Sequence, residues 1–144
     1  MNDDFEMNLS SGIAAFEAKH FATAANLLAP LADQGDAEAQ YRMAIMCQNG
    51  LGRAKNEVDA VKWMRLAADQ GQPYAQHGLG FMYMHGECVP QDNAEALKWF
   101  TLAAEQGLPG SAMMLGMMYE QGQGVAADPE KAKEWYKAAE EAQD

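Results

Sequence analysis

The six residues LAADQG at positions 66–71 return as LAAEQG at positions 102–107, and this repetition decides the fold. A shorter relative, LADQG, stands upstream at positions 31–35, so the closing glycines of the three phrases are 36 residues apart each time. The same 36-residue step links all three tryptophans of the chain, Trp63, Trp99 and Trp135. A fixed period of this length is typical of repeat proteins in which each unit packs against its neighbours.

The middle unit indicates how one repeat is built. Pro73 suits the first turn of a helix, where its missing N–H costs nothing, and apolar residues follow it at helical spacing. Gly86 ends this helix, because glycine accepts the left-handed conformation that closes helix C-termini. Asp92 and Glu95 form a capping-box pattern at the start of a second helix, which ends at Gly107. We therefore predict an all-α chain of about eight helices in antiparallel pairs.

The repeat predicts a single repeat domain over residues 1–144. Three full units are expected at 36–71, 72–107 and 108–144, behind a shorter and degenerate unit at 1–35. The last unit ends in a densely charged helix, as expected of a solvent-facing cap. The units are expected to stack into one continuous core, because no single unit buries its own apolar face.

Two further predictions concern the glycines inside helices and the helix ends of the first unit. Gly80 and Gly116 lie inside helices, where glycine costs about 1 kcal/mol relative to alanine, so we predict close helix contacts at both. In the first unit, Ser10 is interpreted as the cap that precedes the first helix, and Lys19 and His20 form a tight connection to the second.

Composition narrows the classes of partner and compartment. Ten basic residues against 21 acidic ones give a formal charge of −11, which repels nucleic-acid phosphates and anionic membrane surfaces. No apolar run approaches the ~20 residues of a membrane span, and the acidic start shows no signal peptide. We therefore expect a cytoplasmic protein, although a periplasmic or secreted chain that starts after a removed signal would look the same. The sparse cysteines, Cys47 and Cys88, are expected to be unpaired thiols.

Residues 36–144 resemble the Sel-one-like repeat (SLR) family, a relative of the tetratricopeptide repeat. The signature is LGMMYEQGQGV at 115–125 followed by AKEWY at 132–136, and the middle unit repeats it as LGFMYMHG at 79–86 and ALKWF at 96–100. Cys47 and Cys88 depart from the family pattern, replacing a tyrosine and a loop glycine. The resemblance implies a right-handed α-α superhelix with a concave groove that scaffolds protein complexes, often in bacterial signalling or envelope biology. It implies no catalytic site and no cofactor.

A second apolar stripe runs along the first helix of each unit, beside the stripe that the core requires. It contains Tyr41, Ile45, Tyr74, His77, Phe81, Met84, Met113 and Met117. By resemblance to tetratricopeptide grooves, this stripe faces the concave surface. Methionine adapts to irregular partners, so we predict a protein or peptide ligand with apolar anchors and some basic residues. The alternative is that these residues complete the packing between repeats.

Two other functions stay open beside the scaffold. His85 and Cys88 bracket a short loop and suggest a metal- or thiol-dependent activity, although structural zinc needs four such ligands. Met113 and Met117, with Met84 or His85, offer soft ligands of the kind that Cu(I) prefers. Ser111 stands where other units have alanine, so it is interpreted as a small packing residue rather than a nucleophile. Self-association through the apolar stripe is the third possibility; the favoured state is a monomer or weak self-association.

Overall fold

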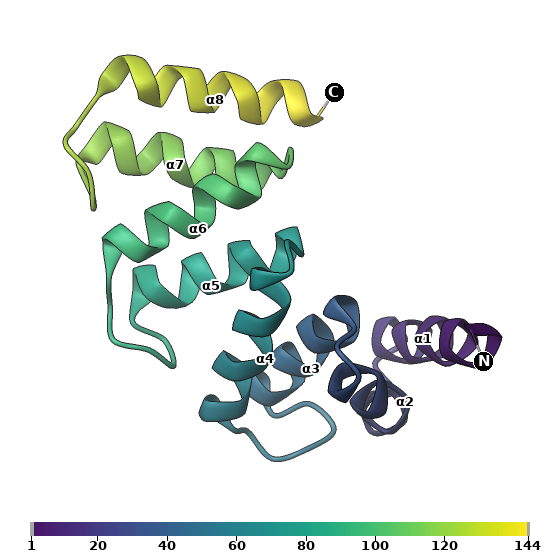
Figure 1. Cartoon of the computed structure of the whole chain (residues 1–144). Helices are drawn as coiled ribbons and strands as arrows, with labels where there is room; N and C mark the ends of the chain where they lie inside the picture. Colours follow the sequence, from purple (N-terminus) through teal and green to yellow (C-terminus); the bar gives the residue numbers. More distant parts are fainter. Residues whose placement is uncertain (1, 144) are drawn as a thin grey trace. The chain divides into compact units, whose positions relative to one another are not determined.

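The computed structural model describes the backbone of residues 2–143 and the side chains of residues 4–142, and this part of the chain forms eight α-helices and no strand (Figure 1). The helices are α1 (Asn2–Glu17), α2 (Phe21–Asp33), α3 (Ala37–Asn49), α4 (Glu57–Asp69), α5 (Pro73–His85), α6 (Asn93–Glu105), α7 (Pro109–Gln121) and α8 (Pro129–Gln143). The predicted all-α fold is confirmed. None of the described helices is both long and apolar enough to cross a lipid bilayer.

The chain divides into two compact units. Unit 1, Met1–Gln72, contains α1 to α4, and unit 2, Pro73–Asp144, contains α5 to α8. Within each unit, consecutive helices pack as antiparallel hairpins: α1 with α2, α3 with α4, α5 with α6, and α7 with α8. The buried apolar side chains of the hairpins are mostly alanine, leucine and methionine, with the aromatic residues Trp63, Trp99 and Phe100 on α4 and α6.

The three long connections share one set of backbone hydrogen bonds. At the end of the first helix of each hairpin, the N–H groups of Leu51, Glu87 and Gln123 donate to the carbonyls of Met46, Met82 and Met118, at 2.9 Å each. At the start of the next helix, the N–H groups of Asn56, Asp92 and Asp128 donate to the carbonyls of Cys47, Tyr83 and Tyr119, at 2.8–2.9 Å. These bonds tie each loop to the helix before it and satisfy carbonyls that a helix end leaves open.

The capping-box prediction at Asp92 is half right. The Asp92 carboxylate accepts from the N–H of Glu95 at 3.1 Å, as predicted. The reciprocal bond is wrong, because the N–H of Asp92 is already donated to the carbonyl of Tyr83. Tertiary structure thus supplies the acceptor that the Glu95 side chain provides in a capping box.

A small residue on the first helix of a hairpin faces a large one on the second. A Cβ atom on Gly80 would lie 2.9 Å from the Phe100 ring, and one on Gly116 would lie 2.5 Å from the Tyr136 ring. In the first hairpin, a Cβ on Gly12 would lie 2.5 Å from the Leu28 side chain. The predicted close contacts at Gly80 and Gly116 are confirmed, and they explain why glycine is used inside these helices.

The first hairpin differs from the others at its start and at its turn. Ser10 lies inside α1, so its interpretation as a cap before that helix is wrong. The sequence misled because a serine before an apolar run indicates an N-cap only when the helix has not already begun. The tight connection at Lys19 and His20 is confirmed, with Lys19 in the left-handed conformation at φ 67°.

Candidate protein-interaction face

Four of the predicted groove residues form an exposed apolar surface on unit 2. Tyr74 and Phe81 lie seven residues apart on α5, and Met113 and Met117 lie four apart on α7, so each pair shares one side of its helix. Their exposed fractions are 55% for Tyr74, 41% for Phe81, 41% for Met113 and 39% for Met117. We call Tyr74, Phe81, Met113 and Met117, together with His77 between them, the docking face.

His77 joins the two helices of the docking face. Its Nδ1 lies 2.7 Å from Oγ of Ser111 on α7, and its ring packs against Phe100 with centroids 5.2 Å apart. It is half-buried, and burial lowers the pKa of the His77 imidazole below its ordinary value of 6.5. Ser111 is fully buried, as its interpretation as a packing residue requires, and it also makes this hydrogen bond.

Met84 lies partly in the core. Its side chain is half-buried and packs against the cluster of Ala96, Phe100, Leu115 and Met118 between α6 and α7. This placement matches the packing alternative for Met84 more closely than a place on an open surface.

The equivalent positions of unit 1 are less exposed. Tyr41 and Ile45 on α3 are both half-buried. Beside them, Arg42 pairs with Glu38 at 3.1 Å, approaches Glu17 of α1 at 3.8 Å and lies over the ring of Phe16. The α3 surface is therefore shared with charged side chains, unlike the docking face.

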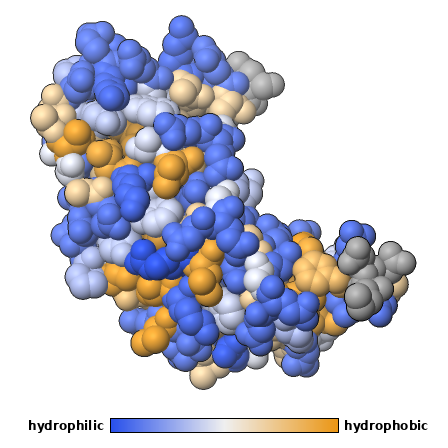
Figure 2. Space-filling model, viewed as in Figure 1, coloured by the Kyte–Doolittle hydropathy of each residue, from blue (hydrophilic) through white to orange (hydrophobic). Residues whose placement is uncertain are grey.

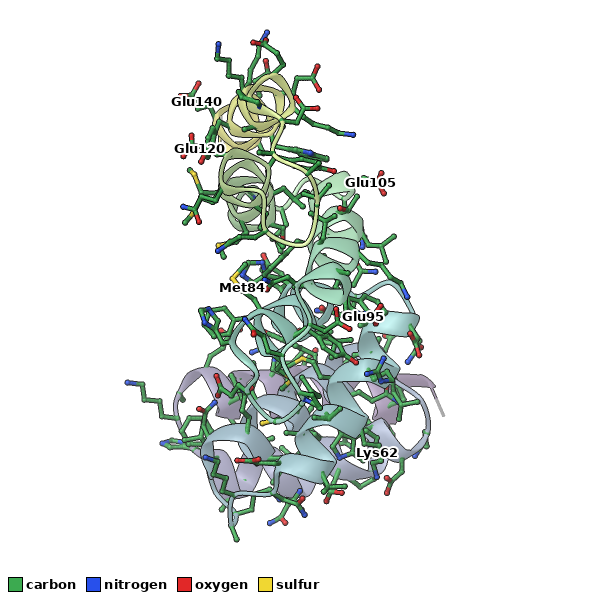
Figure 3. All side chains as sticks on the ribbon, turned by 90° about the vertical axis from the view of Figure 1, so that its left-hand side faces the viewer. Lys62, Met84, Glu95, Glu105, Glu120 and Glu140 are labelled. Carbon is green, nitrogen blue, oxygen red and sulfur yellow. The ribbon has the colours of Figure 1, made fainter. Side chains whose placement is uncertain are left out.

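The two helices of the docking face contain almost no charged residues. The α5 helix contains no Asp, Glu, Lys or Arg, and α7 contains only Glu120. The acidic residues of unit 2 lie on the surrounding elements. Figure 3 shows Glu120 and Glu140 on one side of this unit, and Glu95 and Glu105, both from α6, on the other.

Other exposed apolar residues are scattered. Val58 and Leu66 lie on α4 directly beside charged residues, and Leu102 lies on α6 one turn from Lys98 and Glu105. On the face viewed in Figure 2, hydrophilic residues cover most of the surface and hydrophobic residues appear in small groups. Isolated apolar residues of this kind are normal on a protein surface.

The histidines and cysteines considered for metal or thiol chemistry do not assemble into a metal-binding cluster with carboxylates in the described residues. Within residues 4–142, no group of three His, Cys, Asp or Glu side chains is placed to hold a metal ion. His85 is exposed and its ring contacts that of Phe81 in a tilted arrangement, with ring centroids 4.2 Å apart. Neither Cys47 nor Cys88 forms a disulfide, and burial raises the pKa of the Cys47 thiol.

The sequence interpretation missed a pair of glutamines that occurs in two successive repeats, 36 residues apart. Gln40 and Gln76 are buried, and their Oε1 atoms accept from Nε2 of Gln70 and Gln106 respectively, at 2.8 Å in both cases. The third repeat has alanine at both places, Ala112 and Ala142. This joint replacement was the signal available in the sequence, because two residues that change together within one chain are expected to be in contact.

Solved structures of other proteins share this fold. A protective antigen of uropathogenic Escherichia coli that displays an SLR fold is 39% identical over 81% of this chain and 25% of its own, with a TM-score of 0.79. A Sel1 repeat protein from Oxalobacter formigenes is 33% identical over 94% of this chain and 54% of its own, with a TM-score of 0.88. The cysteine-rich protein B of Helicobacter pylori is 14% identical over 98% and 90% of the two chains, with a TM-score of 0.63, and shows the fold alone.

The first two of these proteins are longer than this chain, which spans a quarter and about half of their lengths. A comparison with curated protein sequences finds no match. The model of the Sel1 repeat matches three times, at residues 37–72, 73–108 and 109–144. Proteins built from this repeat are generally non-catalytic scaffolds for protein–protein interaction. With three consecutive repeats over most of its length, the chain belongs to the Sel1 repeat family.

Proposed function

We propose that this protein is an interaction scaffold whose docking face binds a peptide or protein partner. One observation carries the proposal: four large apolar side chains are exposed on α5 and α7. These two helices together contain one charged residue, Glu120, in a chain of net charge −11. Removing such side chains from water is favourable by about 25 cal/mol for each Å² of apolar surface. Aromatic residues of this kind often dominate the free energy of binding at an interface.

The chemistry of unit 2 limits the kind of partner. Unit 2 contains 11 acidic residues and four basic ones, so an acidic partner is repelled from its surroundings. A partner with apolar anchors and neutral or basic neighbours is complementary to the docking face. The same charge disfavours nucleic acid and anionic membranes. The two methionines allow the face to adjust to the shape of the bound side chains.

We place this scaffold in a bacterial signalling or cell-envelope assembly. The similar solved proteins come from bacteria, and one of them is described as a protective antigen, which supports an envelope context. A cytoplasmic location is our first proposal, with a periplasmic or secreted location as the alternative. Fractionation of the source cells, followed by detection with an antibody, distinguishes the two.

Affinity capture with matched variants tests the docking face. Immobilised wild-type protein, Phe81→Glu and Leu102→Glu are each exposed to lysate of the source organism. Leu102 is the control, because it is an apolar residue on α6 with an exposed fraction of 37%, close to that of Phe81, and it lies outside the docking face. We expect a partner to be retained by the wild type and by Leu102→Glu, and lost by Phe81→Glu.

Three other outcomes contradict the proposal. Capture of the same partner by Phe81→Glu places binding on another surface. Loss of the partner by both variants shows that any added negative charge is sufficient, so the docking face has no special role. If the wild type retains nothing and sedimentation shows a dimer that Phe81→Glu dissociates, then the face is a self-association surface instead. Circular dichroism of each variant confirms that its helices are intact.

A further inference from the structure

The tautomer of His77 follows from its contact with Ser111. Ser111 is fully buried, and among the described residues its hydroxyl has no hydrogen-bond partner other than Nδ1 of His77. If Nδ1 carried the proton, it would donate to Oγ and leave the hydroxyl hydrogen of Ser111 buried without an acceptor, which is unfavourable. The Ser111 hydroxyl therefore donates to Nδ1, and the proton of the neutral ring lies on Nε2.

Nε2 of His77 is left as an available donor. Within the described part of the chain it has no hydrogen-bond partner, and it is not among the buried unpaired nitrogen and oxygen atoms, so solvent reaches it. His77 is three residues after Tyr74 and four before Phe81, on the same side of α5. An N–H donor with a fixed direction thus lies between the apolar side chains of the docking face.

We propose that His77 recognises the partner by donating a hydrogen bond from Nε2–H. The partner is an extended, non-acidic peptide segment, and one of its main-chain carbonyls accepts this bond. This inference rests on the proposed function of the docking face. A partner that covers His77 must supply an acceptor, because a donor that is buried without one loses its bond to water.

The acceptor is a main-chain carbonyl for two physical reasons. A carboxylate would have to approach a unit with 11 acidic and four basic residues, and α5 offers no Lys or Arg to pair with it. A helix is a poorer partner, because most of its carbonyls already accept a bond from the N–H group four residues later, and only those of its last turn are open. An extended segment offers free carbonyls, with side chains on either side that reach Tyr74 and Phe81.

The tautomer is measured first, without any partner. Long-range proton–nitrogen NMR spectra of the labelled protein at neutral pH distinguish Nε2–H from Nδ1–H in each of the three histidines. The variant His77→Met/Ser111→Ala assigns the signal of His77. It is expected to fold, because it copies residues that the repeat already carries at these positions, Met113 and Ala75. We expect Nε2–H; a spectrum that shows Nδ1–H overturns the inference.

The partner class is tested with a phage-displayed library of random dodecapeptides. Peptides that bind the wild type are synthesised and titrated against Phe81→Glu and His77→Met/Ser111→Ala. We expect Phe81→Glu to lose binding, and the double variant to bind about 5- to 10-fold more weakly, since the carbonyl of the peptide then lacks its donor. The selected sequences should be apolar, free of Asp and Glu, and extended by NMR when bound.

The outcomes separate this inference from the proposed function. If Phe81→Glu loses binding while the double variant binds as well as the wild type, the docking face stands and the role of His77 is overturned. Acidic or helical peptides overturn the partner class. If the peptides still bind Phe81→Glu, or if no peptide is selected, both proposals fail.

Discussion

The α3 helix of unit 1 and the α5 and α7 helices of unit 2 occupy the same place in the repeat, but they present different surfaces. On α3, Tyr41 and Ile45 are half-buried beside the ion pair of Arg42 with Glu38. On α5 and α7, Phe81, Met113 and Met117 are exposed at the corresponding positions, although His77 is half-buried, and the two helices contain one charged residue, Glu120. The same repeat thus supports a half-buried surface in one unit and a more exposed one in the other. The exposure of this stripe is decided by the residues that each repeat adds to its shared framework.

The inner contacts of the hairpins differ in a parallel way. In unit 2, glycines at positions 80 and 116 face the rings of Phe100 and Tyr136. The corresponding pair in α3 and α4 is Ala44 and Met64, both buried. A flexible methionine leaves room for a Cβ atom, whereas an aromatic ring against the helix backbone does not.

The largest effect is expected at the contact of Gly116 with Tyr136. The change Gly116→Ala puts a Cβ atom 2.5 Å from the ring and should lower the free energy of unfolding by about 3 kcal/mol, as overpacking does. Adding Tyr136→Met recreates the pair found in unit 1 and should recover most of this loss. Urea denaturation of the single and double variants measures both values.

Gly110→Ala is the control for this contact. A Cβ atom there would meet only the His77 ring, at 3.6 Å, so the change should stabilise the protein slightly. A loss at Gly110 equal to that at Gly116 would mean that added side chains in α7 are harmful in general and that the ring contact is not the cause.

The second effect concerns partner binding at one repeat position in the two units. Phe81→Gln and Ile45→Gln place the same neutral residue at positions 36 apart. We expect the first to weaken binding of the captured partner by about 30-fold, and the second by less than about threefold. Isothermal titration calorimetry gives both affinities. Equal losses would show that unit 1 contributes to binding as much as unit 2, despite its ion pair.

The third effect concerns the contribution of the Gln76–Gln106 pair to the free energy of unfolding. The third repeat lacks this pair and shows what can replace it. Gln106→Ala removes the donor to the buried Gln76 and should cost about 1–2 kcal/mol of unfolding free energy. The variant Gln76→Ala/Gln106→Ala copies Ala112 and Ala142, and should cost less than the sum of the two single changes. Thermal denaturation of the four proteins completes this cycle, and strict additivity would argue against a direct interaction.

The fourth effect concerns the loops. Cys88 has φ 67°, close to the φ 69° and φ 70° of Gly52 and Gly124 in the other two long loops. A residue with a Cβ atom is strained in this left-handed region, so Cys88→Gly should stabilise the protein by about 1 kcal/mol. Cys88→Ala keeps the Cβ atom and should have little effect. If both changes stabilise equally, the thiol rather than the backbone is the source of the strain.

The smallest effect is a pH dependence due to His77. Burial lowers the pKa of His77 in the folded protein below the unfolded value of about 6.5. The unfolded chain therefore takes up a proton first as the pH falls, and folding stability falls from about pH 7 until the folded pKa is passed. Its neighbours Ser111, Phe100 and Gly110 carry no charge that opposes this effect. The melting temperature of the wild type should fall more between pH 7.5 and 5.5 than that of His77→Met/Ser111→Ala; equal falls would contradict the assignment.

Much of the fold followed from spacing alone. The 36-residue period, Pro73, Gly86 and Asp92 located helix boundaries, because each residue acts on the backbone within a few positions of itself. Ser10 misled for the same reason, since its local signal does not reveal that α1 has already begun. The bond from Asp92 N–H to the Tyr83 carbonyl joins residues nine apart, and no local pattern predicts it.

The candidate site was predictable in its composition and not in its exposure. The sequence placed Tyr41, Phe81, Met84 and Met117 in one stripe, since helical periodicity determines which residues share a side. Phe81 and Met117 are exposed, whereas Tyr41 and Met84 are half-buried. Exposure depends on what neighbouring helices bring to the same place, and those neighbours are distant in sequence.

By itself, the sequence determined the repeat, its helix pairs and the apolar character of the first helices, because these follow from periodicity and short-range backbone preferences. Tertiary structure alone decided that Ser111 meets His77, that Gln106 meets Gln76 and that the surface of α3 is shared with an ion pair. Each of these contacts joins side chains from different helices. Its existence depends on packing distances of a few ångströms, which no single helix specifies.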